Sequence, residues 1–298
     1  MDLSEFSQMC ERIYTGSGII TALDQSGGST PTALNAYGIK DEEITSDEVM
    51  FAMMHAMRRR VMQSPGFNSS KVLGAILFED TLHRNVDNVP TPEYLWKRKH
   101  IVPFLKVDKG LLPVHNGVQL MKPMPTLETL LEKASLYSIF GTKMRSVIHE
   151  PNQKGIDEIV TQQFEVASRI IEFGFTPIIE PEVSIHCSEK LKAEQMLKTA
   201  LLDKLDTLSD SIKIMLKLTL PSQANFYSEF TSHPNVVKVL ALSGGYSLEE
   251  AIGLLAQNTR VIASFSRALL NGLNVNQTDD EFDNHLTNKI LGIYRASL

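Results

Sequence analysis

Cysteine is scarce in this sequence, and its scarcity excludes several kinds of protein. Only Cys10 and Cys187 occur among 298 residues, which is too few for a disulfide framework or a thiolate metal site. We therefore expect both to be free thiols in a reducing compartment. The histidines show no spacing typical of metal ligands, so the sequence predicts neither a structural zinc nor another metal site.

Long hydrophobic runs and basic stripes are also missing. No apolar stretch of about 18 residues occurs, and residues 1–5 hold no basic region followed by an apolar core. We therefore expect neither export nor a membrane partner. The formal net charge is −6, with lysines and arginines scattered among acids, so nucleic acid is not an expected partner. The densest basic run, Arg58-Arg59-Arg60, closes a helical pattern and is predicted to be a solvated helix end.

The chain shows no break between domains. No stretch rich in proline, glycine or serine divides it, and no short repeat or low-complexity tract is present. A chain of 298 residues that is 43% hydrophobic can bury a large core. We therefore predict a single domain over residues 1–298.

Apolar runs of strand length alternate with helical patterns along the chain. The runs lie at residues 18–24, 73–79, 102–108, 142–148, 176–182, 212–220, 236–243 and 260–266. Helical spacing of apolar residues is found between them at residues 46–62, 126–140, 155–173 and 189–205. This alternation indicates parallel strands joined by crossover helices, as in a (β/α)8 barrel or a doubly wound open sheet.

Polar residues at the ends of these runs favour the closed barrel. An open sheet binds its ligand mainly at one switch point, whereas a barrel collects side chains from the ends of many strands. Nearly every run ends in polar residues, among them Asp24, Glu79, Lys217 and Ser243. We therefore predict an α/β fold that consists of a single (β/α)8 TIM barrel.

Three of the runs end in pairs of charges spaced two residues apart. The pairs are Lys106 and Asp108, Lys143 and Arg145, and Glu180 and Glu182. Residues two apart on a strand point to the same side. Charges directed outward would lie unpaired beneath the helices, so we expect these side chains to point inward at the barrel mouth. The alternative is a set of ion pairs that only plugs the barrel.

Lys217 is a cation within an apolar run, residues 212–220, where solvent should be scarce. Burial disfavours the charged form of a lysine, so such an amine can attack a carbonyl and form an imine. Glu180 and Glu182 offer carboxylates for the proton transfers that this chemistry requires, and Glu180 is our choice for the proton carrier. On position alone, the commoner alternative is a strand-end lysine that pairs with a carboxylate.

Two loops have the composition of a phosphate site. Residues 242–245, Leu-Ser-Gly-Gly, follow the seventh run, and residues 263–267, Ala-Ser-Phe-Ser-Arg, follow the eighth. Barrels often hold phosphate at these places with backbone amides and a helix start, and Arg267 can offer a forked donor. The alternative is a simple turn before a helix, since Ser247 and Glu250 would form a capping box.

A similar loop, residues 24–31, follows the first run. A turn with helix caps would explain it. However, Asp24 would also lie at the mouth among the cations Lys106, Lys143 and Arg145. The site could therefore bind a substrate that carries an anionic group at each end. The sequence contains no Walker-type phosphate loop.

Taken in order, these segments resemble class I fructose-bisphosphate aldolase, the metal-free branch of aldolases that forms an imine. The matching segments are Ala22–Ser26, Ile76–Glu79, Leu105–Gly110, Lys143–Arg145, Ile179–Glu182, Met215–Lys217, Leu242–Gly245 and Ser264–Leu269. Each segment is short, but the ordered set is highly specific.

The resemblance implies a role for each predicted site residue. Lys217 would be the imine-forming lysine, Glu180 the general acid and base, and Asp24 the group that handles the substrate hydroxyl proton, with Lys143 assisting electrostatically. The residues implied for the phosphate beside the ketone are Ser243, Gly244, Ser266 and Arg267. Those implied for the far phosphate and the hydroxyls are Ser26, Ser29, Lys106 and Arg145. Glu182 and Ser264 complete the predicted substrate-binding set, and no cofactor is implied.

The implied activity is reversible cleavage of fructose 1,6-bisphosphate to dihydroxyacetone phosphate and glyceraldehyde 3-phosphate in the cytoplasm. One alternative is an aldolase for an epimer such as tagatose 1,6-bisphosphate, because the motifs do not report the orientation of one hydroxyl. Another is a sugar-phosphate binding protein that has lost the chemistry. Intact Lys217, Glu180 and Asp24 argue against it, because phosphate binding alone needs none of the three.

The sequence departs from the animal pattern of the family. The two residues after Lys217 are leucine and threonine where proline and asparagine are expected, and glycine is usual at Ser266. The segment that follows, residues 268–298, lacks the long tail with a functional tyrosine, so Tyr294 is not assigned that role. These differences indicate a bacterial-type short form. They leave the subunit contacts open, from monomer to homo-oligomer.

Overall fold

The computed structural model describes residues 3–298 and contains eight parallel strands that follow the order of the chain around one sheet. The strands are β1 (Ile19–Leu23), β2 (Val72–Leu77), β5 (Val102–Lys106), β7 (Gly141–Ile148), β8 (Thr176–Val183), β9 (Ile214–Thr219), β10 (Val236–Leu242) and β11 (Val261–Ala263). A backbone hydrogen bond from Ala22 N to Phe265 O, 3.2 Å long, joins the first strand to the segment after the last. The sheet thus forms the predicted (β/α)8 barrel.

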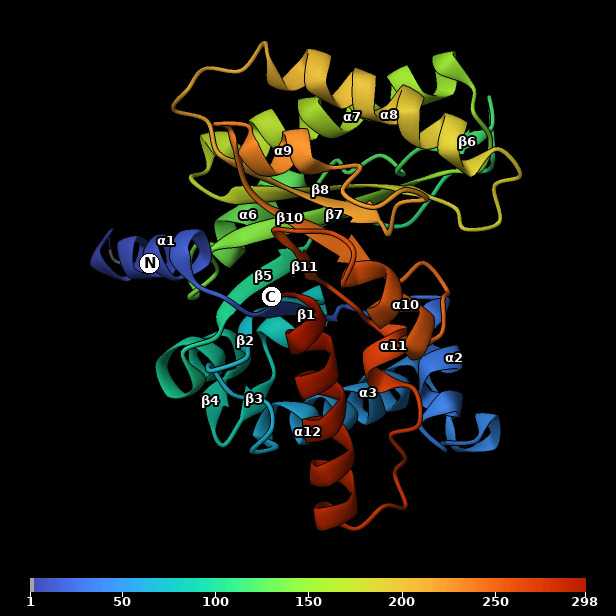
Figure 1. Cartoon of the computed structure of the whole chain (residues 1–298). Helices are drawn as coiled ribbons and strands as arrows, with labels where there is room; N and C mark the ends of the chain where they lie inside the picture. The colour runs from blue at the N-terminus through green and yellow to red at the C-terminus, as the bar shows by residue number, and fades with distance from the viewer. Residues whose placement is uncertain (1–2) are drawn as a thin grey trace.

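Helices connect the strands and cover the outside of the barrel (Figure 1). The longer helices are α1 (Leu3–Thr15), α2 (Ser29–Ala36), α3 (Asp47–Gln63), α6 (Leu127–Ala134), α7 (Gln153–Glu172), α8 (Lys190–Leu205), α10 (Leu248–Leu255) and α12 (Asp279–Ala296). The shorter ones are η1 (Asp41–Glu43), α4 (Glu79–Leu82), α5 (Thr91–Glu93), η2 (Tyr94–Arg98), α9 (Ser228–Ser232) and α11 (Arg267–Leu270). A small hairpin, β3 (Asn85–Val86) with β4 (Val89–Pro90), lies between β2 and β5, and β6 (Val118–Gln119) pairs antiparallel with β7.

Most predicted elements are confirmed, and two differ in length. The helix expected at residues 126–140 ends at Ala134, because the chain then turns and Phe140 N donates to Pro103 O at 2.9 Å at the start of the next strand. The apolar residues after Ala134 therefore enter the barrel and do not continue a helix. The eighth strand is limited to Val261–Ala263, since the residues that follow leave the sheet.

Local capping residues fix where several helices begin. Ser46 accepts a hydrogen bond from Val49 N at the start of α3, and Asn152 accepts one from Gly155 N at the start of α7. Capping boxes begin α10 (Ser247 with Glu250) and α12 (Thr278 with Glu281), and the first of these confirms the predicted box. Each such cap satisfies amides that the first helical turn leaves without partners.

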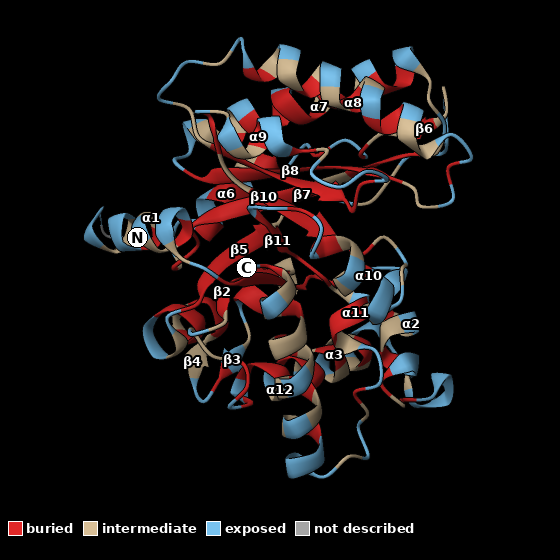
Figure 2. Ribbon diagram, in the orientation of Figure 1, coloured by how far each residue is buried: buried red, intermediate tan, exposed pale blue. Residues whose placement is uncertain are grey.

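The strands are buried on both faces, as Figure 2 shows in red, while the outer faces of the helices are exposed. Within the barrel, the ring of Phe104 lies between two glycines on the neighbouring strands. A Cβ at Gly74 would lie 2.9 Å from this ring, and one at Gly141 would lie 3.1 Å from it. The two glycines therefore leave the space that the large ring fills, which keeps the barrel interior closely packed.

Helix α1 closes the end of the barrel opposite to α2, α10 and α11 (Figure 1). Met9 and Ile13 are fully buried and belong to the same hydrophobic cluster as the inward residues of the strands. Phe6 stacks on Phe140 with ring centroids 5.3 Å apart. The apolar face of α1 thus covers the N-terminal ends of the strands.

On several strands the inward side changes from apolar to charged along its length. On β5 the inward positions run from Phe104 to Lys106, and on β9 they run from Met215 to Lys217. Since residues two apart share a face, the residues of the apolar interior and those of the charged rim occupy successive inward positions of the same strands. The prediction that the charged pairs point inward is confirmed.

The basic run at residues 58–60 corrects one prediction, because only Arg59 is an exposed residue of a solvated helix end. Arg58 is 0% exposed and donates to Gln25 O at 2.5 Å and to Thr81 Oγ1 at 3.0 Å. Burial lowers the pKa of the Arg58 guanidinium to about 10, against the attraction of nearby carboxylates. Arg60 reaches across to Gln277 O at 2.6 Å.

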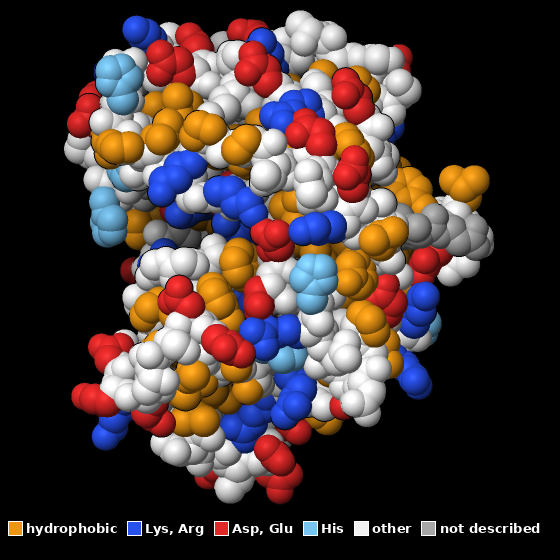
Figure 3. All heavy atoms as spheres, turned by 180° about the vertical axis from the view of Figure 1, so that it is seen from behind, with side chains coloured by type: hydrophobic (Ala, Val, Ile, Leu, Met, Phe, Trp, Pro, Cys, Tyr) orange, Lys and Arg blue, Asp and Glu red, His pale blue; other side chains and the backbone are white. Residues whose placement is uncertain are grey.

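Charges of both signs are intermixed on the face of the molecule shown in Figure 3, in line with the sequence. Within residues 3–298, none of the helices combines the length and apolar character that crossing a bilayer requires. Cys10 and Cys187 are both free thiols, as expected.

We predict that Met9→Ala destabilises the protein by about 2 to 5 kcal/mol, because it leaves a cavity between α1 and the barrel interior. Urea unfolding followed by circular dichroism measures the change. Ser7→Ala, at an exposed position of the same helix, is the matched control and should change the unfolding free energy by less than about 0.5 kcal/mol. Equal effects of the two substitutions would contradict the sealing role of α1.

Candidate active site

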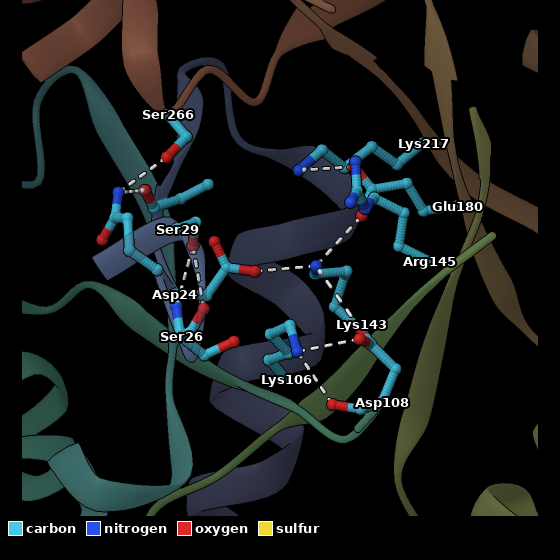
Figure 4. A network of polar contacts seen from close by, with 12 residues as sticks. Asp24, Ser26, Ser29, Lys106, Asp108, Lys143, Arg145, Glu180, Lys217 and Ser266 are labelled. Atoms are coloured by element: carbon cyan, nitrogen blue, oxygen red, sulfur yellow. Dashed lines mark hydrogen bonds and ion pairs between the residues drawn. The ribbon is translucent and has the colours of Figure 1, made fainter. Parts of the chain in front are cut away.

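The predicted site residues lie together around one cavity of about 840 Å³ at the C-terminal ends of the strands. Those that line it are Asp24, Ser26, Ser29, Lys106, Lys143, Arg145, Glu180, Glu182, Lys217, Ser243, Gly244, Ser264, Ser266 and Arg267. They come from seven of the eight strands or the loops after them, the arrangement that a closed barrel predicts. The charged members form a connected network (Figure 4).

Lys143, on β7, is the centre of this network. Its Nζ lies 2.7 Å from Asp24 Oδ2, 3.1 Å from Glu180 Oε2 and 3.9 Å from Asp108 Oδ2. The three carboxylates come from β8 and from the segments after β1 and β5, so a single ammonium group holds three parts of the barrel mouth together.

Lys217 lies within β9 and is 4% exposed. Its Nζ is 3.0 Å from Glu180 Oε1. The lysine is therefore both buried, as the apolar run indicates, and paired with a carboxylate, as the alternative interpretation holds. Glu180 contacts Lys217 through one oxygen and Lys143 through the other, so it can exchange a proton with either amine.

Two further ion pairs lie at the rim, and the first of them joins the network through Asp108. Lys106 Nζ lies 2.8 Å from Asp108 Oδ1, and Arg145 Nη1 lies 2.6 Å from Glu182 Oε2. Glu182 thus neutralises an arginine, whereas Glu180 faces the two buried lysines. This difference in partners supports the choice of Glu180 as the proton carrier.

The network shifts the pKa values of its central members. Burial alone would raise the pKa of Asp24, but the attraction of Lys143, Lys217 and Lys106 outweighs burial and holds that pKa well below its usual range. Burial alone would lower the pKa of Lys143, but Asp24, Glu180 and Asp108 raise it well above its usual range. Asp24 is therefore a carboxylate and Lys143 an ammonium at neutral pH.

The loops after β10 and β11 present donors to the cavity. Gly244 has φ +62°, a conformation that favours glycine, and the backbone there faces the cavity beside the buried Ser243. Ser264 Oγ is buried without a hydrogen-bond partner in the described part of the chain. Arg267 is exposed and makes no hydrogen bond or ion pair through its side chain to another described residue. An unpaired arginine beside free backbone and hydroxyl groups is suited to binding phosphate.

The loop after β1 lies beside the loop after β11, since Gln25 Nε2 donates to Ser266 Oγ at 2.7 Å. Ser26 N donates to Ser29 Oγ at 3.1 Å, and Ser29 Oγ donates to Ser26 O at 2.9 Å, which forms a tight turn at the start of α2. Both serines lie near Asp24, while Lys217 and Arg145 lie across the site (Figure 4). The serine hydroxyls therefore lie on one side of the cavity, and the cations of Lys217 and Arg145 lie on the other (Figure 4).

Sequence reasoning missed several residues of the site. Asp108 was expected at the mouth but not as a partner of Lys143, and Gln25 received no role although it follows Asp24 directly. Gln25 Nε2 donates to Ser266 Oγ at 2.7 Å, a contact between residues far apart in the chain. Tyr246 also lines the cavity, and its position beside the predicted glycines is the one signal that could have identified it.

Comparison with known proteins agrees with this geometry. The sequence model described as "Fructose-bisphosphate aldolase class-I" matches residues 5–226. The chain is 54% identical over 298 residues to a protein of Synechocystis sp. named "Fructose-bisphosphate aldolase class 1", with 100% of this chain and 99% of the relative covered. It is 53% identical over 287 residues to a protein of the same name from Clostridium acetobutylicum, with 96% and 97% covered.

A solved structure of fructose-bisphosphate aldolase from Plasmodium falciparum superposes with a TM-score of 0.72 and covers 100% of this chain and 96% of its own. At 20% identity this likeness concerns the fold alone. The family match extends over most of the barrel, and the relatives match it from end to end. The chain belongs to the family of class I fructose-bisphosphate aldolases.

Proposed function

We propose that this protein cleaves fructose 1,6-bisphosphate reversibly to dihydroxyacetone phosphate and glyceraldehyde 3-phosphate, through an imine on Lys217. The observation that carries the proposal is the buried Lys217 amine 3.0 Å from Glu180. A buried lysine beside a proton acceptor suits attack on a carbonyl, and phosphate binding alone would not require this pair.

The first stage forms the imine. Glu180 takes a proton from the Lys217 ammonium, and the neutral amine adds to the C2 carbonyl of the substrate. Glu180 then returns that proton to the C2 oxygen and passes to it a second proton from the added nitrogen, so that the oxygen leaves as water when the iminium forms. The contact between Glu180 and Lys143 at 3.1 Å keeps the carboxylate in place during these transfers.

The second stage breaks the bond between C3 and C4. Asp24 accepts the proton of the C4 hydroxyl, and the electrons of the breaking bond flow into the iminium, which gives an enamine and releases glyceraldehyde 3-phosphate. Protonation of the enamine at C3 and hydrolysis of the resulting iminium release dihydroxyacetone phosphate and restore the Lys217 amine. The protonated imine accepts these electrons better than a ketone does.

The ammonium group of Lys143 positions the carboxylates of both Asp24 and Glu180. Its ammonium lies 2.7 Å from Asp24 and 3.1 Å from Glu180, and its raised pKa keeps it charged throughout the cycle. The charge holds Asp24 ionised and ready to accept a proton. It also stabilises negative charge that develops on the substrate oxygens near this end of the cavity.

The two ends of the cavity suit the two phosphates. Arg267, Ser266 and Gly244 face the side where the phosphate near C2 would lie. Lys106, on β5, would hold the phosphate on C6 together with Ser26, whose loop adjoins Ser266 through Gln25. We also propose a cytoplasmic location, because the family model is described as glycolytic and the two free thiols suit a reducing compartment. The homo-oligomer stays a prediction.

Reduction with borohydride in the presence of dihydroxyacetone phosphate should attach the triose to Lys217 alone, because only this lysine would form an imine. Peptide mapping by mass spectrometry locates the adduct. Lys217→Arg should give no adduct, and a chelator should leave turnover unchanged. An adduct on another lysine would contradict the mechanism, and turnover of tagatose 1,6-bisphosphate alone would contradict the substrate.

Substitutions at the two ends of the cavity should separate two substrates. Lys106→Met should lower kcat/KM for fructose 1,6-bisphosphate about ten- to a hundred-fold while changing that for fructose 1-phosphate much less, because the second sugar lacks the far phosphate. Arg267→Ala should lower both values by a similar factor, corresponding to about 1.5 to 3 kcal/mol. Steady-state kinetics measures the four ratios. Equal losses for both substrates with Lys106→Met would place Lys106 outside the far phosphate site.

The lowered pKa of Asp24 should make stability depend on pH. A carboxyl group whose pKa is depressed by folding stabilises the protein above its unfolded pKa of about 4, and this stabilisation is lost as the pH falls through that range toward the folded pKa. Between about pH 5 and pH 3, the unfolding free energy of the wild type should therefore fall by about 1 to 3 kcal/mol more than that of Asp24→Asn.

Urea unfolding at each pH measures this difference. Asp203→Asn, at an exposed position of α8, is the control and should follow the wild type. A fall in stability that is the same for Asp24→Asn and the wild type would show that the charge of Asp24 does not contribute.

A further inference from the structure

The barrel has a seam between its first and last strands. In the described part of the chain, no ladder of paired residues joins β1 to β11, and their link is the single backbone hydrogen bond from Ala22 N to Phe265 O. Ala263 N, which would face β1 in a continuous sheet, donates to Ser297 Oγ at 3.1 Å instead. The mouth above this seam therefore depends on side chains for its geometry.

Gln25 supplies the side-chain link. Its amide is buried, with 8% of the residue exposed, and Nε2 donates to Ala22 O at 3.3 Å and to Ser266 Oγ at 2.7 Å. The shorter contact connects the loop after β1 with the loop after β11. Ser266 lies in Figure 4 on the same side of the site as Ser26 and Ser29.

Arg58 fixes which way the Gln25 amide points. The guanidinium is fully buried and donates to Gln25 O at 2.5 Å, and it lies 3.5 Å from Gln25 Oε1. It has no carboxylate within ion-pair distance among residues 3–298. Because a cation attracts the amide oxygen and repels the amide NH2 group, Arg58 holds Oε1 toward itself and turns Nε2 toward Ser266.

This orientation decides the direction of the Ser266 hydroxyl. A serine hydroxyl carries one hydrogen, and its oxygen accepts from Gln25 Nε2, so that hydrogen remains available for a different acceptor. Ser266 is half-buried on the wall of the cavity, next to the exposed Arg267. A phosphate oxygen in the cavity is an acceptor that matches a hydroxyl donor and the neighbouring cation.

We propose that Gln25, held by Arg58, is a positioning residue that turns the Ser266 hydroxyl so that it donates its hydrogen bond to a phosphate oxygen of the substrate. The proposal rests on the proposed function and adds a specificity for anions at this wall. Gln25 and Arg58 act on the phosphate through the Ser266 hydroxyl.

The test uses Gln25→Glu, which keeps the shape of the side chain and replaces a donor by an acceptor. A carboxylate would accept the Ser266 hydrogen and pair with Arg58, so folding would be retained while the serine would no longer donate to phosphate. The readout is the Kd of hexitol 1,6-bisphosphate, which has no ketone and cannot form an imine, measured by calorimetry on the whole enzyme. Ser266→Ala and the double variant complete the cycle.

We expect Gln25→Glu and Ser266→Ala each to raise Kd about ten-fold and the double variant to bind no more weakly than Ser266→Ala. The melting temperature of Gln25→Glu should be equal to that of the wild type or higher. Gln25→Met, which removes the amide without adding charge, should raise Kd only about three-fold, because a freely rotating hydroxyl can still donate. This smaller effect should vanish in the Ser266→Ala background.

Three outcomes would overturn the proposal. An unchanged Kd for a folded Gln25→Glu shows that the hydroxyl direction does not matter. A further ten-fold loss in the double variant shows that the new charge repels phosphate directly. If Gln25→Glu does not fold, Gln25→Met decides the question. A rise in Kd with Gln25→Met that persists in the Ser266→Ala background contradicts the proposal. Wild-type enzyme that binds no hexitol bisphosphate and cleaves no ketose bisphosphate would instead contradict the proposed function.

Discussion

The ammonium group of Lys143 is the interaction on which the rest of the mouth depends. It is buried, and it lies within 4 Å of carboxylates from three separate parts of the barrel. Removing one partner from such a cluster leaves an uncompensated charge in a place where solvent cannot screen it. The carboxylates of Asp24 and Glu180 are therefore held at fixed positions before any substrate arrives, which is the condition for rapid proton transfer.

The apolar interior confines this charged cluster to the mouth of the barrel. Below the mouth, Phe104 fills the space left by two glycines, and α1 closes the far end of the strands. Water is thus excluded from one side of the network, and the charges face a single cavity. The same alternation of residues along each strand that packs the interior also aims Lys106, Lys143 and Lys217 into the cavity.

Much of the fold and the site could be predicted from the sequence. The spacing of apolar and charged residues indicates which face of a strand they share, and the place of a loop after a strand indicates the rim on which it lies. The spacing of two between Lys143 and Arg145, or between Glu180 and Glu182, predicts a shared face, and the loops around Ser243 and Arg267 predict donors at one rim. What could not be predicted depends on contacts between distant segments. Arg58 reads as a solvated helix end because its burial comes from packing against the loop at Gln25, and the link from Gln25 to Ser266 spans most of the chain.

The seam between β1 and β11 also bears on how the protein is made. Residues 19–23 leave the ribosome before the other seven barrel strands and residues 261–263 leave it after all of the others, so the free edge of β1 has no neighbour on that side while the strands between are made. Long-range pairing of this kind is slow, and an open strand edge can pair with another chain. A nascent chain of this protein is thus most exposed to misassembly just before its last strand appears, when the barrel is almost complete but still open.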